Sequence, residues 1–164
     1  MRIAILSDTH LPRGARRLPD DALVELRAAA LILHAGDVID AGTLDALEAL
    51  GPPVLAVHGN VDRPAVRVRL PERRVVAAGA VRIGMVHDAG ASGGRLARLR
   101  RQFPDCHAVV FGHSHIPLLE RDETGFQIFN PGSPTDRRRQ PTRTMGRARV
   151  EGDAITFALV DLGP

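Results

Sequence analysis

The chain has 164 residues, of which 44% are apolar, 25% are charged and one is cysteine. This length and apolar content suffice for a single domain over residues 1–164, and the lone Cys106 excludes an intrachain disulfide or a thiolate metal site. No apolar segment approaches the length of a membrane span, and Met1 leads directly into a strand-like stretch, so we expect a cytoplasmic protein.

Arginine supplies all 22 basic residues, although the formal net charge at pH 7 is only +3. Two arginine clusters, at residues 98–101 and 137–139, have the chemistry to bind phosphate. The chain has no tryptophan or tyrosine and only five phenylalanines, which is little material for stacking nucleic-acid bases. Solvated surface arginines are therefore the favoured interpretation, and nucleic acid is a secondary candidate partner.

The first two thirds of the chain alternate short apolar runs with helical patterns. Three helices are expected: one opened by Asp20 and Asp21, one capped by Thr43 and one capped by Ser92. The apolar runs that predict buried strands are residues 3–6, 31–33, 54–57 and 81–86.

From residue 106 onward the pattern changes to short strands joined by turns. The strands predicted in this part are residues 108–111, 117–121, 126–129, 147–151 and 154–160. Residues 122–125 and 152–153 predict hairpin turns, and the Pro-, Arg- and Thr-rich residues 130–143 predict a long loop. An alternating half followed by an antiparallel half predicts an α/β fold in which two sheets pack face to face with helices outside.

Seven side chains of metal-ligand type follow these apolar runs: Asp8, His10, Asp37, Asn60, His87, His113 and His115. His113 and His115, in the stretch FGHSHIP, point the same way in an extended segment, because side chains alternate faces. Loops at the carboxyl ends of parallel strands converge, so we expect all seven side chains to meet. Gly36, Gly59 and Gly112 let the backbone turn sharply beside them.

Seven nitrogen and oxygen ligands are too many for one tetrahedral zinc but suit two metals that share a carboxylate, about 3.5 to 4 Å apart. The bridging carboxylate would offset the repulsion between the cations, and a hydroxide held between them would attack a phosphate ester. Imidazole and carboxylate without thiolate favour two divalent ions such as Mn²⁺, with Ni²⁺, Fe²⁺, Co²⁺ and Zn²⁺ as alternatives.

The motifs occur in an order and spacing that resembles the calcineurin-like metallophosphoesterases. They are SDTH at residues 7–10, GD at 36–37, GNVD at 59–62, His87, GHSH at 112–115 and NPGS at 130–133. More narrowly, they are similar to the small single-domain phosphodiesterase branch of bacteria and archaea. The resemblance implies a four-layer αββα sandwich of two mixed sheets flanked by helices.

The same resemblance implies roles for the seven residues and a small phosphodiester as the substrate. Asp37, Asn60 and His113 would act in catalysis, with Asn60 also orienting the phosphate. One metal would be bound by Asp8, His10 and His115 and the other by Asn60, His87 and His113, with Asp37 bridging.

Two positions depart from the family. Larger phosphatases of the superfamily place a histidine, which can protonate the leaving group, where this chain has Val61. Its absence removes a contribution of about 10²- to 10⁴-fold in rate, so we predict a preference for diesters or activated leaving groups over unactivated monoesters. Asp88 stands where relatives usually have glycine, and a hydrogen bond to a neighbouring ligand and a solvated position are both open.

Several polar residues near the motifs receive structural interpretations. His34, His58 and His107 lie off the register of the ligands and are expected to be structural. Asp62 either supports the ligands or caps a helix. Arg13 is assigned to the surface, and Asn130 and Ser133 are expected to shape the loop beside the site.

Two other functions and the oligomeric state stay open. A retromer subunit of the same family keeps the fold, has lost part of the metal chemistry and serves as a protein-interaction scaffold. The complete ligand set of this chain favours an enzyme over such a metal-binding scaffold. A nuclease that uses the arginine clusters is the third candidate, and it predicts strongly salt-dependent binding. A homo-oligomer is also compatible with the sequence.

Overall fold

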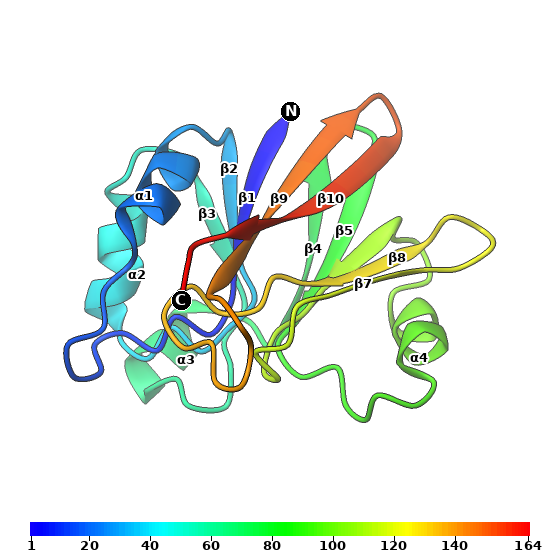
Figure 1. The fold of residues 1–164 in the computed structure, drawn as a ribbon. Coiled ribbons are helices and arrows are strands. Elements are labelled where there is room, and N and C mark those ends of the chain that lie inside the picture. Colours follow the sequence, from blue (N-terminus) through cyan, green and yellow to red (C-terminus); the bar gives the residue numbers. More distant parts are fainter.

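The computed structural model describes residues Met1–Pro164. Two five-stranded sheets pack face to face and helices cover their outer faces, which confirms the expected four-layer αββα sandwich (Figure 1). None of the helices is long and apolar enough to cross a membrane.

The first sheet combines the two ends of the chain. Its strands lie in the order β10 (Ala154–Asp161), β9 (Thr144–Glu151), β1 (Arg2–Leu6), β2 (Leu31–His34) and β3 (Val54–Ala56). Strands β1, β2 and β3 are parallel, and the hairpin of β9 and β10 adds antiparallel strands beside β1.

The second sheet is formed by the middle of the chain. Its order is β4 (Arg73–Ala78), β5 (Val81–Val86), β6 (Ala108–Val110), β8 (Gln127–Asn130) and β7 (Leu118–Arg121). Strands β5, β6 and β8 are parallel, whereas the edge strands β4 and β7 are antiparallel to their neighbours. The parallel strands are the three central strands of the second sheet, whereas in the first sheet they extend from β1 to the edge strand β3. The carboxyl ends of these parallel strands carry the predicted ligands.

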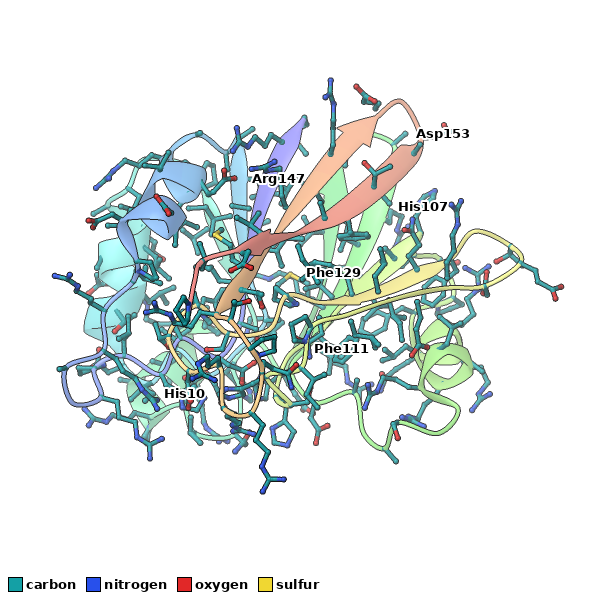
Figure 2. All side chains as sticks on the ribbon, in the orientation of Figure 1. His10, His107, Phe111, Phe129, Arg147 and Asp153 are labelled. Carbon is teal, nitrogen blue, oxygen red and sulfur yellow. The ribbon has the colours of Figure 1, made fainter.

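The main core lies between the two sheets and contains 18 buried apolar residues. At its centre Phe129 stacks on Phe157 with ring centroids 4.7 Å apart, and Phe129 lies between the sheets in Figure 2. Smaller clusters lie under the helices: α1 (Asp20–Arg27) and α2 (Ala41–Glu48) cover the first sheet, and α4 (Arg95–Gln102) covers the second.

Two predicted helix caps are wrong. The Asp40 carboxylate, not Thr43, caps α2 by accepting the Thr43 N–H at 3.1 Å, while the Thr43 hydroxyl donates to the Leu11 carbonyl. Helix α4 begins after Gly94, whose φ of 65° is left-handed, so Ser92 lies two residues too early to cap it.

Two elements lack a clear sequence signal. Helix α3 (Pro64–Arg69) has six residues, which is too short to show a helical period. The edge strand β4 begins with two arginines and alternates exposed and buried residues, and its apolar part is confined to residues 75–78.

Candidate metal centre

The seven predicted ligands converge at one edge of the sandwich. Each follows the carboxyl end of a parallel strand: Asp8 and His10 follow β1, Asp37 follows β2, Asn60 follows β3, His87 follows β5, and His113 and His115 follow β6. Figure 2 shows His10 among the loops at the lower edge of the molecule, away from the labelled His107 and Asp153. The parallel strands of both sheets thus supply one site together.

One group within the site contains Asp8, His10 and His115, whose ligand atoms lie within 4.8 Å of one another. The Asp8 Oδ1 atom is 3.4 Å from Nε2 of His115 and 3.7 Å from Nε2 of His10. All three side chains are buried. Buried carboxylate and imidazole atoms at this spacing form a chelating set for a divalent cation.

The second group lies around Asp37 and His87. The Asp37 Oδ2 atom is 3.3 Å from Nε2 of His87 and 3.4 Å from Nε2 of His10, so this oxygen lies between the two groups. Asn60 Oδ1 lies 3.2 Å from His87 Nε2 and 2.9 Å from His113 Nδ1. Asn60 and His113 are exposed, whereas Asp37 and His87 are buried, so this group opens toward solvent.

Backbone carbonyls orient two of the imidazole rings. His115 Nδ1–H donates to the Asp136 carbonyl and His87 Nδ1–H donates to the Ala35 carbonyl, both at 2.7 Å. Each bond places the hydrogen on Nδ1 and turns Nε2 toward the centre. Asp136 carries no signal in the sequence, because nothing in the loop pattern indicates which carbonyl meets His115.

The two carboxylates are also held by donors from other loops. Asp8 Oδ2 accepts from the Ser7 hydroxyl at 2.7 Å and from the His113 N–H at 3.0 Å, and Asp37 Oδ1 accepts from the Val61 N–H at 3.0 Å. In both carboxylates one oxygen is anchored and the other faces the histidines.

Five of the seven residues have left-handed backbones, which side-chain-bearing residues rarely adopt and which cluster at functional sites. They are Asp8 (φ 55°), His10 (49°), Asp37 (60°), His113 (68°) and His115 (59°). Aspartate and histidine tolerate this region better than most residues. The conformation turns each strand end sharply and directs its side chain into the site.

Glycine is required where loops cross the carboxylates. A Cβ atom on Gly59 would lie 2.6 Å from the Asp37 nitrogen, and one on Gly112 would lie 2.7 Å from Asp8 Oδ2. Of the three glycines expected to allow a sharp backbone turn, Gly36 has a left-handed φ of 96°, whereas Gly59 and Gly112 do not and are needed instead for lack of space.

The charges of the site are strongly coupled. Burial disfavours ionisation of Asp8, but interactions with His10 and His115 outweigh it and lower the pKa of Asp8 below its usual range. Burial likewise opposes the charge of Asp37, and His10 and His87 lower its pKa. Burial disfavours the charged form of His10, yet Asp37 and Asp8 raise its pKa to about 9.

The donor atoms have the properties that a bound cation requires. Asp8 Oδ1 and the Nε2 atoms of His10 and His115 are buried without any hydrogen-bond partner. A buried polar atom without a partner is costly, and a divalent cation would satisfy all three at once. Oxygen and imidazole nitrogen without thiolate fit Mn²⁺, Fe²⁺, Co²⁺, Ni²⁺ and Zn²⁺.

The sequence profile of the calcineurin-like phosphoesterase superfamily domain matches residues 1–153. The chain belongs to the calcineurin-like phosphoesterase superfamily. A probable metallophosphoesterase of Methanothermobacter thermautotrophicus is 32% identical over 99% of this chain and 94% of its own length. One of Methanocaldococcus jannaschii is 34% identical over 99% of this chain and 82% of its own.

Solved structures agree with the calcineurin-like fold. A Thermotoga maritima protein solved by solution NMR is 30% identical, covers 98% of both chains and has a TM-score of 0.76. Wild-type Vps29 of Entamoeba histolytica complexed with Zn²⁺ is 22% identical, covers 99% of this chain and 100% of its own, and has a TM-score of 0.78.

The two departures from the calcineurin-like pattern have clear positions. Val61 is 42% exposed and directly follows Asn60, so its apolar side chain lies at the mouth of the site. Asp88 is exposed, and its Oδ1 accepts the Gly90 N–H at 2.7 Å. Asp88 therefore forms a local turn and makes no hydrogen bond to a predicted ligand.

Other residues of the motifs have the expected structural roles. Buried His34 bonds to the Thr9 hydroxyl and the Gly36 N–H, and burial lowers its pKa to about 4. His107 Nδ1 accepts the Arg82 N–H. Asn130 donates to the Gly112 carbonyl and the Ser133 hydroxyl donates to the Asp8 carbonyl, so both shape the loops beside the site.

The first arginine cluster is largely structural. Arg98 donates to the carbonyls of Ala89, Ala91 and Gly93, which braces the loop before α4. Arg100 lies over the ring of Phe126, 5.0 Å from its centroid. Arg98 and Arg100 are therefore half-buried and make contacts within the fold, instead of being fully solvated as the sequence suggests.

Proposed function

We propose that this chain is a metal-dependent phosphodiesterase that acts on small phosphodiesters with two divalent ions, Mn²⁺ being the favoured metal. The observation that carries this proposal is the position of Asp37 Oδ2, which lies 3.4 Å from His10 Nε2 and 3.3 Å from His87 Nε2. An oxygen that faces two imidazoles from two separate groups is suited to bridge two cations.

Two sets of metal ligands share the carboxylate of Asp37. When bound, the metals supply Lewis acidity and lower the pKa of water so that a nucleophile forms near neutral pH. The first set comprises Asp8, His10 and His115, whose ligand atoms lie within 4.8 Å of one another. The second comprises Asn60, His87 and His113, and Asp37, whose Oδ2 faces both His10 and His87, is common to both sets. The ligand atoms of Asp8, Asp37 and His87 also lie within 4.8 Å of one another, so the two carboxylates are adjacent.

The chain's own residues bind and orient the phosphodiester. Asn60 Oδ1 faces His87 and His113, which leaves the amide Nδ2 free to donate to a phosphate oxygen. The exposure of Asn60 and His113 gives the substrate a path to the buried carboxylates. A pocket of about 330 Å³ that includes Asn60 and His87 offers room for one ester substituent.

The environment of Val61 favours diesters. A valine cannot donate a proton, so a leaving alkoxide at the mouth of the site receives no help from this position. Good leaving groups, such as aryl oxides, do not need to be protonated as they leave. We therefore expect aryl diesters to be cleaved faster than unactivated alkyl monoesters.

The test is hydrolysis of bis-p-nitrophenyl phosphate by metal-stripped protein that is titrated with Mn²⁺, compared with the Asp37→Asn variant. We expect metal-dependent turnover in the wild type and at least a hundredfold lower rate in the variant. A wild type that is folded but inactive with Mn²⁺, Ni²⁺, Co²⁺, Fe²⁺ and Zn²⁺ would contradict the proposal and favour a metal-binding scaffold. Asp153→Asn is the matched control, because Asp153 is exposed in the turn between β9 and β10 and lies far from His10 (Figure 2).

A further inference from the structure

Four arginines line one pocket next to the metal centre. The pocket has a volume of about 560 Å³ and lies between the loop after His10 and the loop before β9; its polar lining is Arg13, Arg16, Arg17, Thr135 and Arg143. Among these four arginines, Arg16 forms an ion pair of 2.9 Å with the carboxylate of Asp136. Arg13 and Arg17 are exposed and have no carboxylate partner. The pocket therefore carries uncompensated positive charge.

One guanidinium nitrogen in this pocket lacks an acceptor. Arg16 Nη2 contacts Asp136, but Arg16 Nη1 is buried and has no hydrogen-bond partner. A buried charged donor without an acceptor is unfavourable, and an anion that enters the pocket would satisfy it. This atom distinguishes the pocket from an ordinary solvated cluster of arginines.

The loop before β9, which forms one wall of the pocket, also holds residues of the metal centre in place. The Thr135 hydroxyl donates to the Thr9 carbonyl at 2.6 Å, and the Asp136 carbonyl accepts from His115 Nδ1 at 2.7 Å. Asp136 Oδ2 lies 2.9 Å from Arg16 Nη2 and 3.9 Å from His115 Nδ1. The Arg16 guanidinium is therefore within about 7 Å of the His115 ring, the span of two consecutive polar contacts.

We propose that this arginine pocket binds a second phosphate of the substrate, so that the preferred substrates are phosphodiesters that carry a further phosphate group. This inference rests on the proposed phosphodiesterase function. A guanidinium group matches phosphate oxygens with two parallel hydrogen bonds, and a terminal phosphate carries a charge of about −1.5 to −2 at pH 7. Diesters with a single phosphate cannot use the pocket while their phosphorus is at the metal centre.

The substrate expected to occupy the pocket is a short phosphorylated diester and not a long nucleic-acid strand. The pocket is a local hollow formed by two loops. The chain also has no tryptophan or tyrosine on which successive bases of a strand would stack. The substrate therefore needs one additional phosphate group, a few bonds from the phosphorus at which it is cleaved.

The test compares a thymidylyl dinucleotide with the same dinucleotide phosphorylated at its 5′ or 3′ end. We expect the wild-type protein to cleave one phosphorylated form with a kcat/KM about 10- to 100-fold higher than that of the unphosphorylated dinucleotide. The difference should lie mainly in KM, because the arginine pocket contacts the extra phosphate both in the bound substrate and in the transition state. The double variant Arg13→Ala/Arg17→Ala should lose this preference and keep its activity on the unphosphorylated dinucleotide. The control Arg27→Ala/Arg101→Ala, which removes two exposed arginines elsewhere, should keep the preference.

A binding measurement separates this inference from the proposed function. A fluorescently labelled, 5′-phosphorylated dithymidylate should bind EDTA-treated wild-type protein more tightly than the pocket variant, even if the protein hydrolyses no diester. Equal binding to the wild type and the pocket variant would overturn the inference, as would a wild type that does not discriminate between the dinucleotides. Turnover of bis-p-nitrophenyl phosphate without any such preference would leave the phosphodiesterase proposal intact.

Discussion

The carboxylate of Asp62 accepts a hydrogen bond from the backbone N–H of Asp37 at 3.1 Å. The same buried carboxylate accepts from the N–H groups of Gly59 at 2.7 Å and Ile39 at 2.6 Å. It thereby ties the loop after β2 to the loop after β3. The open question from the sequence is resolved in favour of support for the ligands, because Arg63 and not Asp62 precedes α3 as its cap residue.

Replacement of Asp62 by alanine should weaken both the fold and the metal site. The change leaves three backbone N–H groups without their acceptor, so we expect a loss of about 2 to 4 kcal/mol in the free energy of unfolding. Metal affinity should fall about 10- to 100-fold, since the loops that hold Asp37 and Asn60 lose their tie. Denaturant unfolding and calorimetric Mn²⁺ titration measure the two effects. Asp88→Ala, which loses one exposed hydrogen bond, is the control, and an equal effect of both variants would contradict this role.

Gly59→Ala and Gly112→Ala should each disturb the metal centre. The added methyl group meets the Asp37 backbone in the first case and the Ser7 and Asp8 side chains in the second. We expect destabilisation of about 1 to 3 kcal/mol and weaker metal binding. Gly93→Ala is the control, because nothing lies within 4 Å of the added Cβ atom. If both variants bound Mn²⁺ as the wild type does, the glycines would not be needed for space.

The sequence predicts the parallel strands and the convergence of the seven candidate ligands because both depend on local patterns. Apolar runs mark the parallel strands, and an aspartate or histidine directly after such a run must lie at the carboxyl edge of a sheet. The sequence does not reveal which long-range contacts complete the site. The Asp136 carbonyl reaches His115 from 21 residues away, and the β9–β10 hairpin pairs with β1 from the other end of the chain.

Local patterns also fail where an element is short or polar. Helix α3 and strand β4 pack through few apolar residues, so their residues resemble a loop in the sequence. The helix starts are missed for a related reason: at α2 Asp40 and Thr43 are both suitable caps, and α4 begins after Gly94 without a side-chain cap. The arginine pocket cannot be predicted from the sequence, because Arg13 and Arg143 are far apart along the chain.

Apparent metal affinity should rise with pH between about 6.5 and 9. Burial disfavours the protonated ring of His10, but Asp37 and Asp8 raise its pKa to about 9 in the metal-free protein. A metal must displace this proton, so affinity should increase up to tenfold per pH unit for each proton released. Mn²⁺ titrations at pH 6.5, 7.5 and 8.5 give the slope. A flat profile would contradict the placement of His10 in the metal set.

The contribution of His10 to the stability of the metal-free protein should decrease as pH rises, whereas the metal affinity increases. Because the folded pKa of His10 is raised above the unfolded value of about 6.5, its stabilising effect is complete below pH 6.5 and is lost as pH rises through about 9. The free energy of unfolding of wild type minus that of His10→Gln, both in EDTA, should therefore decrease between these values. A difference that grows with pH would show that His10 does not interact with Asp8 and Asp37 as described.

Val61→His should raise the activity on unactivated phosphomonoesters. The side chain at this position is 42% exposed and follows Asn60, so an imidazole there could protonate a leaving group. We expect a gain of at least about tenfold in kcat for an alkyl monoester and little change for aryl diesters. Val68→His, at an 88% exposed position on α3, is the control. Equal gains in both variants, or none at Val61, would contradict this account of the diester preference.

The number of Mn²⁺ ions bound per chain tests the central claim most directly. Equilibrium dialysis of metal-stripped protein against Mn²⁺, with the bound metal measured by atomic absorption, should give two ions per wild-type chain. Replacement of His87 by alanine should reduce this number to one, because the Asp8, His10 and His115 set remains intact. A single ion in the wild type, or two ions retained after loss of His87, would contradict the site in which Asp37 joins two metals.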